Sequence, residues 1–195
     1  MGKIFYLMGK SSTGKDTLFS KLIQQKKHPL KNIVPYTTRP IRAGEQEGVE
    51  YHFTDEEGYQ RFRETGKVIE ERAYNTYHGM WRYFTVDEGQ IDYQHHDYVM
   101  IGTLEAYIKM KEYFGEQVLV PLLIELDDGE RLQRALDRER QQEVPKYEEM
   151  CRRFLADKED FSPEKIAQAG ITRTFVNNRW QDCLEEILAY IEVEG

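Results

Sequence analysis

The chain has 195 residues, of which 39% are hydrophobic and 32% are charged, and its formal net charge is −8 at pH 7. This length suits one domain, or one domain with insertions, and the composition is that of a soluble globular protein. Because a phosphate backbone attracts basic surfaces, the negative charge disfavours a general nucleic-acid-binding protein. We therefore expect no nucleic-acid partner.

The cysteines and the apolar segments indicate in which cellular compartment the protein is expected. Cys151 and Cys183 form neither a CxxC motif nor a disulfide framework, which favours a reducing environment. The apolar run at residues 4–8 is too short for a secretory signal, and the longest one, at 118–126, is interrupted and too short to span a bilayer. No histidine has zinc-ligand spacing. We expect a cytoplasmic protein, a monomer or homodimer, with no membrane partner.

Short apolar runs alternate with amphipathic stretches along most of the chain. The predicted strands are residues 4–8, 98–101, 117–125 and 174–176. The predicted helices span residues 16–24, 104–114 and 127–141, and a closing helix carries Leu184, Ile187, Leu188 and Ile191. Fully apolar strands that alternate with helices favour an α/β fold with a parallel sheet covered on both faces.

Two segments depart from this alternation. Residues 33–84 are rich in tyrosine and contain short strands with glycine turns, which predicts a small mixed or antiparallel insert. A charged, weakly apolar segment at about 138–154 is a candidate mobile lid. We therefore expect a single domain whose core comprises residues 1–32, 85–137 and 155–195.

The segment Gly-Lys-Ser-Ser-Thr-Gly-Lys at residues 9–15 lies between the first predicted strand and the first predicted helix, which is the setting of a phosphate-binding P-loop. In such a loop, backbone amides and the helix N-terminus hold phosphate oxygens. The final residue, Lys15, would reach the β- and γ-phosphates of ATP. The predicted ATP-binding residues here are Gly9, Lys10, Ser11, Ser12, Thr13, Gly14, Lys15, Asp16 and Thr17.

The residue after the P-loop lysine departs from the motif. P-loops place Ser or Thr there to ligate Mg²⁺, whereas this chain has Asp16, followed by Thr17. A carboxylate is also a hard oxygen ligand for Mg²⁺. We therefore expect Mg²⁺ to accompany ATP, with Asp16 or Thr17 as its ligand.

A second phosphate site is indicated within residues 36–53. Arg39 and Arg42 stand three apart, and Tyr51 follows nine residues later. Planar guanidinium groups bind a dianionic phosphate in bidentate fashion, and a phenol adds one directional donor. Glu45, near Arg42, is predicted to be an orienting partner instead of a base, because phosphoryl transfer depends mainly on positioning and charge neutralisation.

These motifs resemble the guanylate kinase family. The resemblance rests on the P-loop, on the run Thr-Thr-Arg-x-x-Arg-x-Gly-Glu-x-x-Gly-x-x-Tyr-x-Phe at residues 37–53, and on the strand Phe175-Val176-Asn177. It is clearest over residues 3–84. It implies a three-layer P-loop kinase fold with a helical lid, and transfer of the γ-phosphoryl group of ATP to GMP.

The resemblance also implies residue roles. The acceptor-binding residues would be Arg39, Arg42, Tyr51, Glu70, Thr103 and either Tyr77 or His78. Among these, Glu70 matches the carboxylate that binds guanine N1 and N2. The catalytic residues would be Lys15 with the lid arginines Arg134 and Arg138, joined by Arg152 or Arg153. Asn177 would lie on the adenine side.

Three departures concern the base. Pro35 replaces a serine that helps to hold guanine, Met80 replaces a small hydroxyl residue, and Ile101-Gly102-Thr103 replaces an Asp-x-Asp. Losing such hydrogen-bonding groups should relax the discrimination between bases.

Two alternatives to GMP phosphorylation follow. Ribose 1,5-bisphosphate phosphokinases are similar in the Gly-Lys-Asp of the P-loop and in a Gly-hydroxyl pair, but they lack the run at residues 37–53, and Glu70 favours guanine. A catalytically silent guanylate-kinase-like binding module is the other alternative. Such modules typically lose the P-loop lysine, whereas Lys15 is present here.

Overall fold

The core of the protein is a parallel five-stranded sheet. The structure is a computed structural model that describes residues 1–42, 44–76 and 79–195. The strands run in the order β2 (Lys31–Asn32), β7 (Tyr98–Ile101), β1 (Ile4–Met8), β8 (Leu119–Glu125) and β9 (Thr174–Val176). All neighbouring pairs are parallel, as the sequence predicted.

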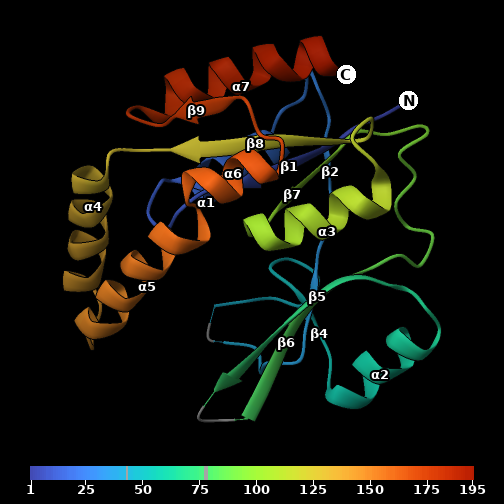
Figure 1. Cartoon of the computed structure of the whole chain (residues 1–195), viewed down its shortest axis with the longest axis horizontal. Coiled ribbons are helices and arrows are strands. Elements are labelled where there is room, and N and C mark those ends of the chain that lie inside the picture. The colour runs from blue at the N-terminus through green and yellow to red at the C-terminus, as the bar shows by residue number, and fades with distance from the viewer. Residues whose placement is uncertain (43, 77–78) are drawn as a thin grey trace.

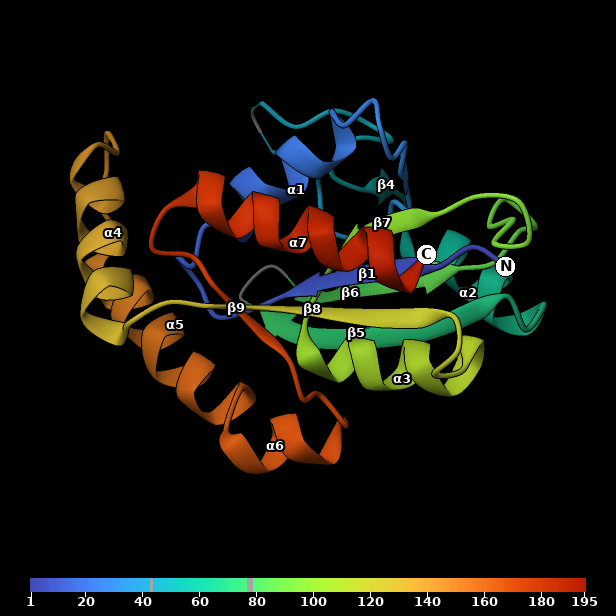
Figure 2. The same cartoon turned by 90° about the horizontal axis from the view of Figure 1, so that it is seen from above.

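Helices cover both faces of this sheet, and the central strand divides its side chains between them. Ile4, Tyr6 and Met8 join one apolar core, with α3 (Leu104–Phe114) and with Ile166 of α6 (Pro163–Gln168). Alternate side chains such as Phe5 join the other core, beneath α1 (Lys15–Ile23) and α7 (Trp180–Glu194). Figure 2 shows the two helical layers on opposite sides of the strands. The alternation reflects the two-residue period of a strand.

Phe175 of β9 offers a test of this packing, because its side chain is 0% exposed within the core beneath α1 and α7. Phe175→Ala is expected to lower the free energy of unfolding by about 3–5 kcal/mol, the usual cost of removing a buried phenyl group. The neighbouring Val176→Ala is the control, because Val176 is 51% exposed and should change stability by less than about 0.5 kcal/mol. Urea denaturation of both variants measures the free energy of unfolding. A similar decrease in both would contradict the orientation of β9, in which Phe175 points into the core and Val176 toward solvent.

A second, mixed sheet stands apart from the core. Its order is β4 (His52–Phe53), β3 (Tyr36–Thr37), β6 (Gly79–Val86) and β5 (Val68–Thr76), with β3 and β4 parallel and the other pairs antiparallel. Tyr59 of α2 (Glu56–Glu64) packs with Phe84 and Val86 to form its small core. Figure 1 shows this sheet below the core sheet. Tyr77 and His78, one of which was predicted in the acceptor site, lie outside the described residues.

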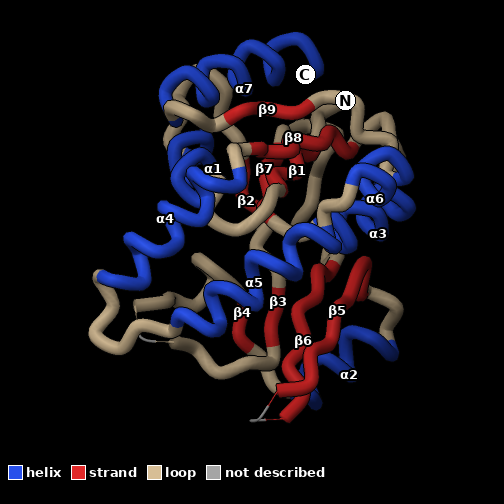
Figure 3. Tube along the Cα trace, turned by 60° about the vertical axis from the view of Figure 1, so that its left-hand side comes forward, coloured by secondary structure: helices blue, strands red, loops and turns tan. Residues whose placement is uncertain are grey.

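The candidate lid consists mostly of helix. Helices α4 (Asp128–Arg140) and α5 (Tyr147–Asp160) contact one another and project from the core, as Figures 1 and 3 show. The start of α4 is fixed by Asp127, whose carboxylate accepts hydrogen bonds from the amides of Gly129 and Glu130. Only a short loop, residues 141–146, separates the two helices. In the described part of the chain, no helix is long and apolar enough to span a membrane.

Candidate active site

The P-loop connects β1 to α1 with an unusual backbone path. Gly9 and Gly14 have φ angles of 155° and 84°, and a Cβ at Gly9 would collide with the carbonyl of Ile124. Ser12 also has a positive φ, 63°, a conformation that costs a non-glycine residue about 1–3 kcal/mol and is found mainly at functional sites. A left-handed residue of this kind turns successive amides into an anion-binding concavity.

Several polar groups of the P-loop are buried and only partly satisfied. The Oγ of Ser12 is buried without a hydrogen-bond partner in the described structure. The ammonium of Lys15 makes only a long contact, 3.5 Å, with the carbonyl oxygen of Lys10, and burial lowers its pKa. Bound phosphates would supply acceptors for both groups. The loop therefore has the features of an anion-binding site.

Asn177 of the predicted adenine side lies against the same loop. Its amide Nδ2 donates to the carbonyl oxygen of Thr13 at 2.6 Å, while its buried Oδ1 has no partner among the described residues. Arg134 joins this cluster: its Nη2 donates to the carbonyl oxygens of Asn177 and Asn178 at 3.3 and 3.4 Å. Arg134, predicted as a catalytic lid arginine, therefore lies beside the P-loop and lines neither of the two cavities described below.

An aspartate near the end of α5 accepts a hydrogen bond from one P-loop amide. The amide of Ser11 donates to Oδ2 of Asp157 at 2.8 Å. Arg131 completes the connection, since its Nε donates to the carbonyl of Ser11 at 3.0 Å and its Nη2 donates to Asp157 at 2.7 Å. The Arg131 side chain is only 1% exposed and also stacks over the ring of Phe154. These contacts join the P-loop to α4 and α5.

Asp157 is expected to compete with ATP phosphates for the Ser11 amide. Replacing it by asparagine removes the competing charge, so ATP should bind about 5–10-fold more tightly, on the scale of one charge-assisted hydrogen bond. Titration calorimetry measures the Kd. Asp160→Asn is the control, because Asp160 is also on α5 and makes no hydrogen bond to the P-loop in the described structure. An equal or weaker ATP affinity in the Asp157 variant would contradict this role.

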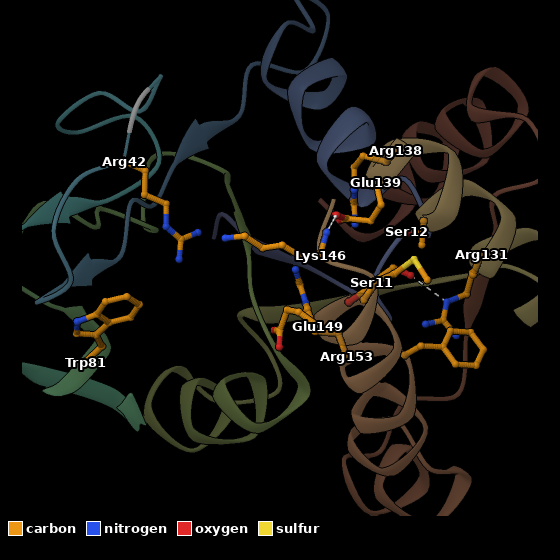
Figure 4. A pocket seen from close by; sticks show the side chains of 13 residues that line it. Ser11, Ser12, Arg42, Trp81, Arg131, Arg138, Glu139, Lys146, Glu149 and Arg153 are labelled. Carbon is orange, nitrogen blue, oxygen red and sulfur yellow. Dashed lines mark hydrogen bonds between the residues drawn. The ribbon is translucent and has the colours of Figure 1, made fainter. Parts of the chain in front are cut away.

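A cationic cavity of about 500 Å³ lies between the P-loop, the lid and the second sheet. Its charged lining residues are Arg42, Arg131, Arg138, Lys146, Arg153, Glu139 and Glu149. Figure 4 shows Arg42 and Trp81 on the side of the second sheet and the lid residues opposite them. The lining has five basic groups and two acidic ones. This excess of positive charge can stabilise phosphate groups during phosphoryl transfer. Of the predicted lid arginines, Arg138 and Arg153 line this cavity.

Arg39 is held by Glu45, the predicted orienting residue. Its Nη1 and Nη2 donate to the two carboxylate oxygens of Glu45 at 2.7 and 2.6 Å, and its side chain is 3% exposed. The hydrogen bond from Arg39 lowers the pKa of Glu45 from 4.5 to about 2. Since the folded pKa is depressed, the pair's contribution to stability is complete above the ordinary pKa of 4.5 and is lost as the pH falls from there toward 2.

One nitrogen of the Arg39 guanidinium is not used by Glu45. This Nε is buried without a hydrogen-bond partner among the described residues. The guanidinium lies over the ring of Tyr51, with 5.0 Å to the centroid. Burial raises the pKa of the Tyr51 phenol, which therefore stays protonated as a donor. Glu45 and Tyr51 thus hold the guanidinium of Arg39 in place; Tyr51 lines the second cavity described next, whereas Arg39 lines neither cavity.

A second cavity, of about 810 Å³, extends from the P-loop along the second sheet. The predicted residues Lys15, Asp16, Tyr51 and Thr103 line it, together with Pro35. Thr103 begins α3, where its Oγ1 accepts a hydrogen bond from the amide of Ala106. The cavity shares Ser11 and Arg153 with the cationic cavity, so the two adjoin.

The predicted guanine-binding carboxylate does not line this second cavity. Glu70 is buried, and its side chain pairs with Arg72 and accepts a hydrogen bond from the hydroxyl of Thr85 at 2.9 Å. Arg72 lines the cavity in its place. The exposed side chain of Met80 is a further departure at a position where the family has a small hydroxyl residue. The sequence analysis missed Arg72, Arg131 and Asp157.

A parallel sheet with a glycine-containing loop after its first strand, two projecting helices and a second sheet are the features of the α/β P-loop kinase fold. A family model described as "Guanylate kinase" matches residues 1–84. A guanylate kinase from Chlorobaculum tepidum is 29% identical over 123 residues, covering 63% of this chain and 61% of its relative. One from Caldanaerobacter subterraneus is 32% identical over 126 residues, covering 63% and 58%.

The fold comparison agrees. The crystal structure of guanylate kinase from Anaplasma phagocytophilum superposes with a TM-score of 0.65 at 21% identity, covering 99% of this chain and 86% of that one. Over residues 1–84 the chain is thus similar to the guanylate kinase family, and its fold is that of the solved guanylate kinase. The alignments with the two curated relatives span about three fifths of those proteins.

Proposed function

We propose that this protein transfers the γ-phosphoryl group of ATP to GMP, forming ADP and GDP. The observation that carries the proposal is the cationic cavity, to which the P-loop, the lid and the second sheet all contribute basic or polar side chains. A kinase needs this convergence, because donor and acceptor phosphates must meet where their charges are neutralised.

The residues would act as follows. Lys15 and the P-loop amides hold the β- and γ-phosphates, while Arg39, Arg42 and Tyr51 hold the acceptor phosphate. Arg138 of the lid stabilises the charge that develops on the transferring group. Arg153 lines both cavities and is suited to the same task. Closing of the lid would exclude water, which otherwise competes as a phosphoryl acceptor.

Mg²⁺ is the proposed metal, and Asp16 fits it. The Asp16 side chain is exposed at the start of α1 and lines the second cavity beside Lys15. Mg²⁺ typically binds through one or two carboxylates plus substrate phosphates, so one aspartate suffices. Within the described residues there is no cluster of three or more His, Cys, Asp or Glu side chains that could hold a metal ion. When bound, Mg²⁺ would neutralise phosphate charge. Thr17 remains the alternative ligand.

The remaining expectations accompany this proposal. ATP and a nucleoside monophosphate are the proposed partners, and a cytoplasmic location and a monomeric or homodimeric state stay predictions from the sequence. The predicted division into core, insert (33–84) and lid (about 138–154) also stays a prediction. Lys15 in its loop supports a kinase over a silent binding module.

An acceptor panel tests the proposal. Purified protein is given ATP and Mg²⁺ with GMP, dGMP, AMP, UMP, CMP or ribose 1,5-bisphosphate, and ADP release is measured. Turnover of GMP well above that of AMP and the pyrimidine nucleotides is the expected result. Turnover of ribose 1,5-bisphosphate alone would show that the sugar phosphate, and not GMP, is the acceptor. No turnover despite ATP binding would favour the binding module.

A further inference from the structure

Arg72 of β5 separates Glu70 from the cavity that would hold the acceptor. Its Nε donates to Oε2 of Glu70 at 3.1 Å and its Nη2 donates to Oε1 at 3.3 Å. The side chain of Glu70 is 1% exposed, whereas that of Arg72 is 12% exposed and lines the second cavity. A ligand in this cavity therefore meets the guanidinium before it can meet the carboxylate.

Arg72 has donors to spare. A guanidinium carries five N–H groups. Two N–H groups of Arg72 donate to Glu70. A third, on Nη1, donates to Oγ1 of Thr103 at 3.3 Å. By this count, two N–H groups remain for a ligand. The pairing with Glu70 and Thr103 holds the guanidinium in one orientation, so these donors are fixed relative to the cavity.

The charge around Arg72 favours a neutral ligand group. The ion pair with Glu70 leaves little net charge at this position. The charged lining of the second cavity is balanced, with Lys15, Arg72, Arg153 and Lys165 against Asp16, Glu105, Asp157 and Asp160. A second phosphate would meet these carboxylates without the basic excess of the cationic cavity. A carbonyl oxygen, by contrast, needs donors and no net charge.

We propose that Arg72 is the specificity-determining residue of the acceptor site and that it recognises the 6-oxo edge of a purine nucleotide. Arginine pairs well with guanine O6 and N7, which together form an acceptor edge. Hypoxanthine presents the same edge, whereas adenine has an amino donor at position 6. Glu70 acts as a positioning residue for Arg72. The 2-amino group of guanine then contributes little, because the carboxylate that would bind it is occupied.

This inference rests on the proposed GMP kinase activity. It predicts in addition that a substrate needs the 6-oxo group of the purine and does not need the 2-amino group. The wild-type protein is assayed by ADP release with GMP, IMP, AMP and 2-aminopurine ribonucleoside 5′-monophosphate. We expect kcat/KM values for GMP and IMP within about 5-fold of one another. The two nucleotides without the 6-oxo group should be about 10–100-fold worse, the range for one bidentate base contact.

Variants assign the discrimination to Arg72. Arg72→Met should reduce the preference for GMP over 2-aminopurine ribonucleotide to less than about 5-fold. Because this change leaves Glu70 buried without its partner, Arg72→Met combined with Glu70→Gln is made as well. Glu70→Gln alone should raise the KM of GMP and IMP equally, leaving their ratio unchanged.

The outcomes separate the inference from the proposed function. A preference of about 50-fold or more for GMP over IMP that is lost in Glu70→Gln would show that Glu70 binds the 2-amino group directly, which overturns the inference and leaves the kinase assignment intact. An unchanged preference for GMP in both Arg72 variants would also overturn it. Absence of turnover with every purine nucleotide would overturn the proposed function, and the inference with it.

Discussion

Replacing Lys15 by alanine is expected to lower kcat for phosphoryl transfer by about 10³-fold. A single neutral donor to a developing negative charge is worth about 10²–10³ in rate, and a cationic group placed on a transferring phosphoryl group is worth more. Lys15 is the half-buried lysine at the end of the P-loop, and desolvation lowers its pKa, so a bound phosphate would restore stabilisation that the ammonium lacks. Steady-state ADP release at saturating substrates measures kcat.

The loss of kcat can be assigned to the missing ammonium group only if Lys15→Ala folds as the wild type does. Lys26→Ala is the matched control, because Lys26 is an exposed lysine just beyond the end of α1. Both variants should keep the wild-type melting temperature within a few degrees, since no strong partner is lost at either position. A Lys15→Ala protein with kcat within about 5-fold of the wild type would show that the P-loop does not bind the reacting phosphates.

The fold was predictable because its strands are continuous apolar runs. A strand such as Tyr98–Ile101 is buried between helices, so nearly every position is apolar and the run stands out from the charged helices around it. The lid was less predictable. Its helices have charged, exposed surfaces, and α5 contains no fully buried residue, so the apolar periodicity that marks a helix is weak between Tyr147 and Asp160.

Sequence motifs located the residues of the candidate site that lie close together in the chain. Glu45 was predicted as an orienting partner near Arg42; the structure instead pairs its side chain with that of Arg39, six residues away, and Arg42 donates only its backbone amide. The contact of Asp157 with Ser11 joins residues 146 positions apart, and no motif spans that distance. One signal was available: Glu70 and Arg72 are two apart on a strand, which places both on the same face.

Replacing Arg39 by alanine should raise the KM for the acceptor by about 10²-fold, with little effect on the Kd of ATP. The loss has two causes. The phosphate loses a charge-assisted donor, and the carboxylate of Glu45, now unpaired, repels it. Steady-state kinetics with varied acceptor at saturating ATP measure the KM, and calorimetry measures the ATP affinity.

A companion variant separates these two causes. Arg39→Ala combined with Glu45→Ala removes the repelling carboxylate, so it should recover about 10-fold of the lost KM while lacking the guanidinium donors. Arg63→Ala is the control for a change of charge, because Arg63 is an exposed arginine on α2. An acceptor KM that stays at the wild-type value in Arg39→Ala would contradict the phosphate role. A KM as high in the double variant as in Arg39→Ala would show that the lost guanidinium, and not the exposed carboxylate, accounts for the defect.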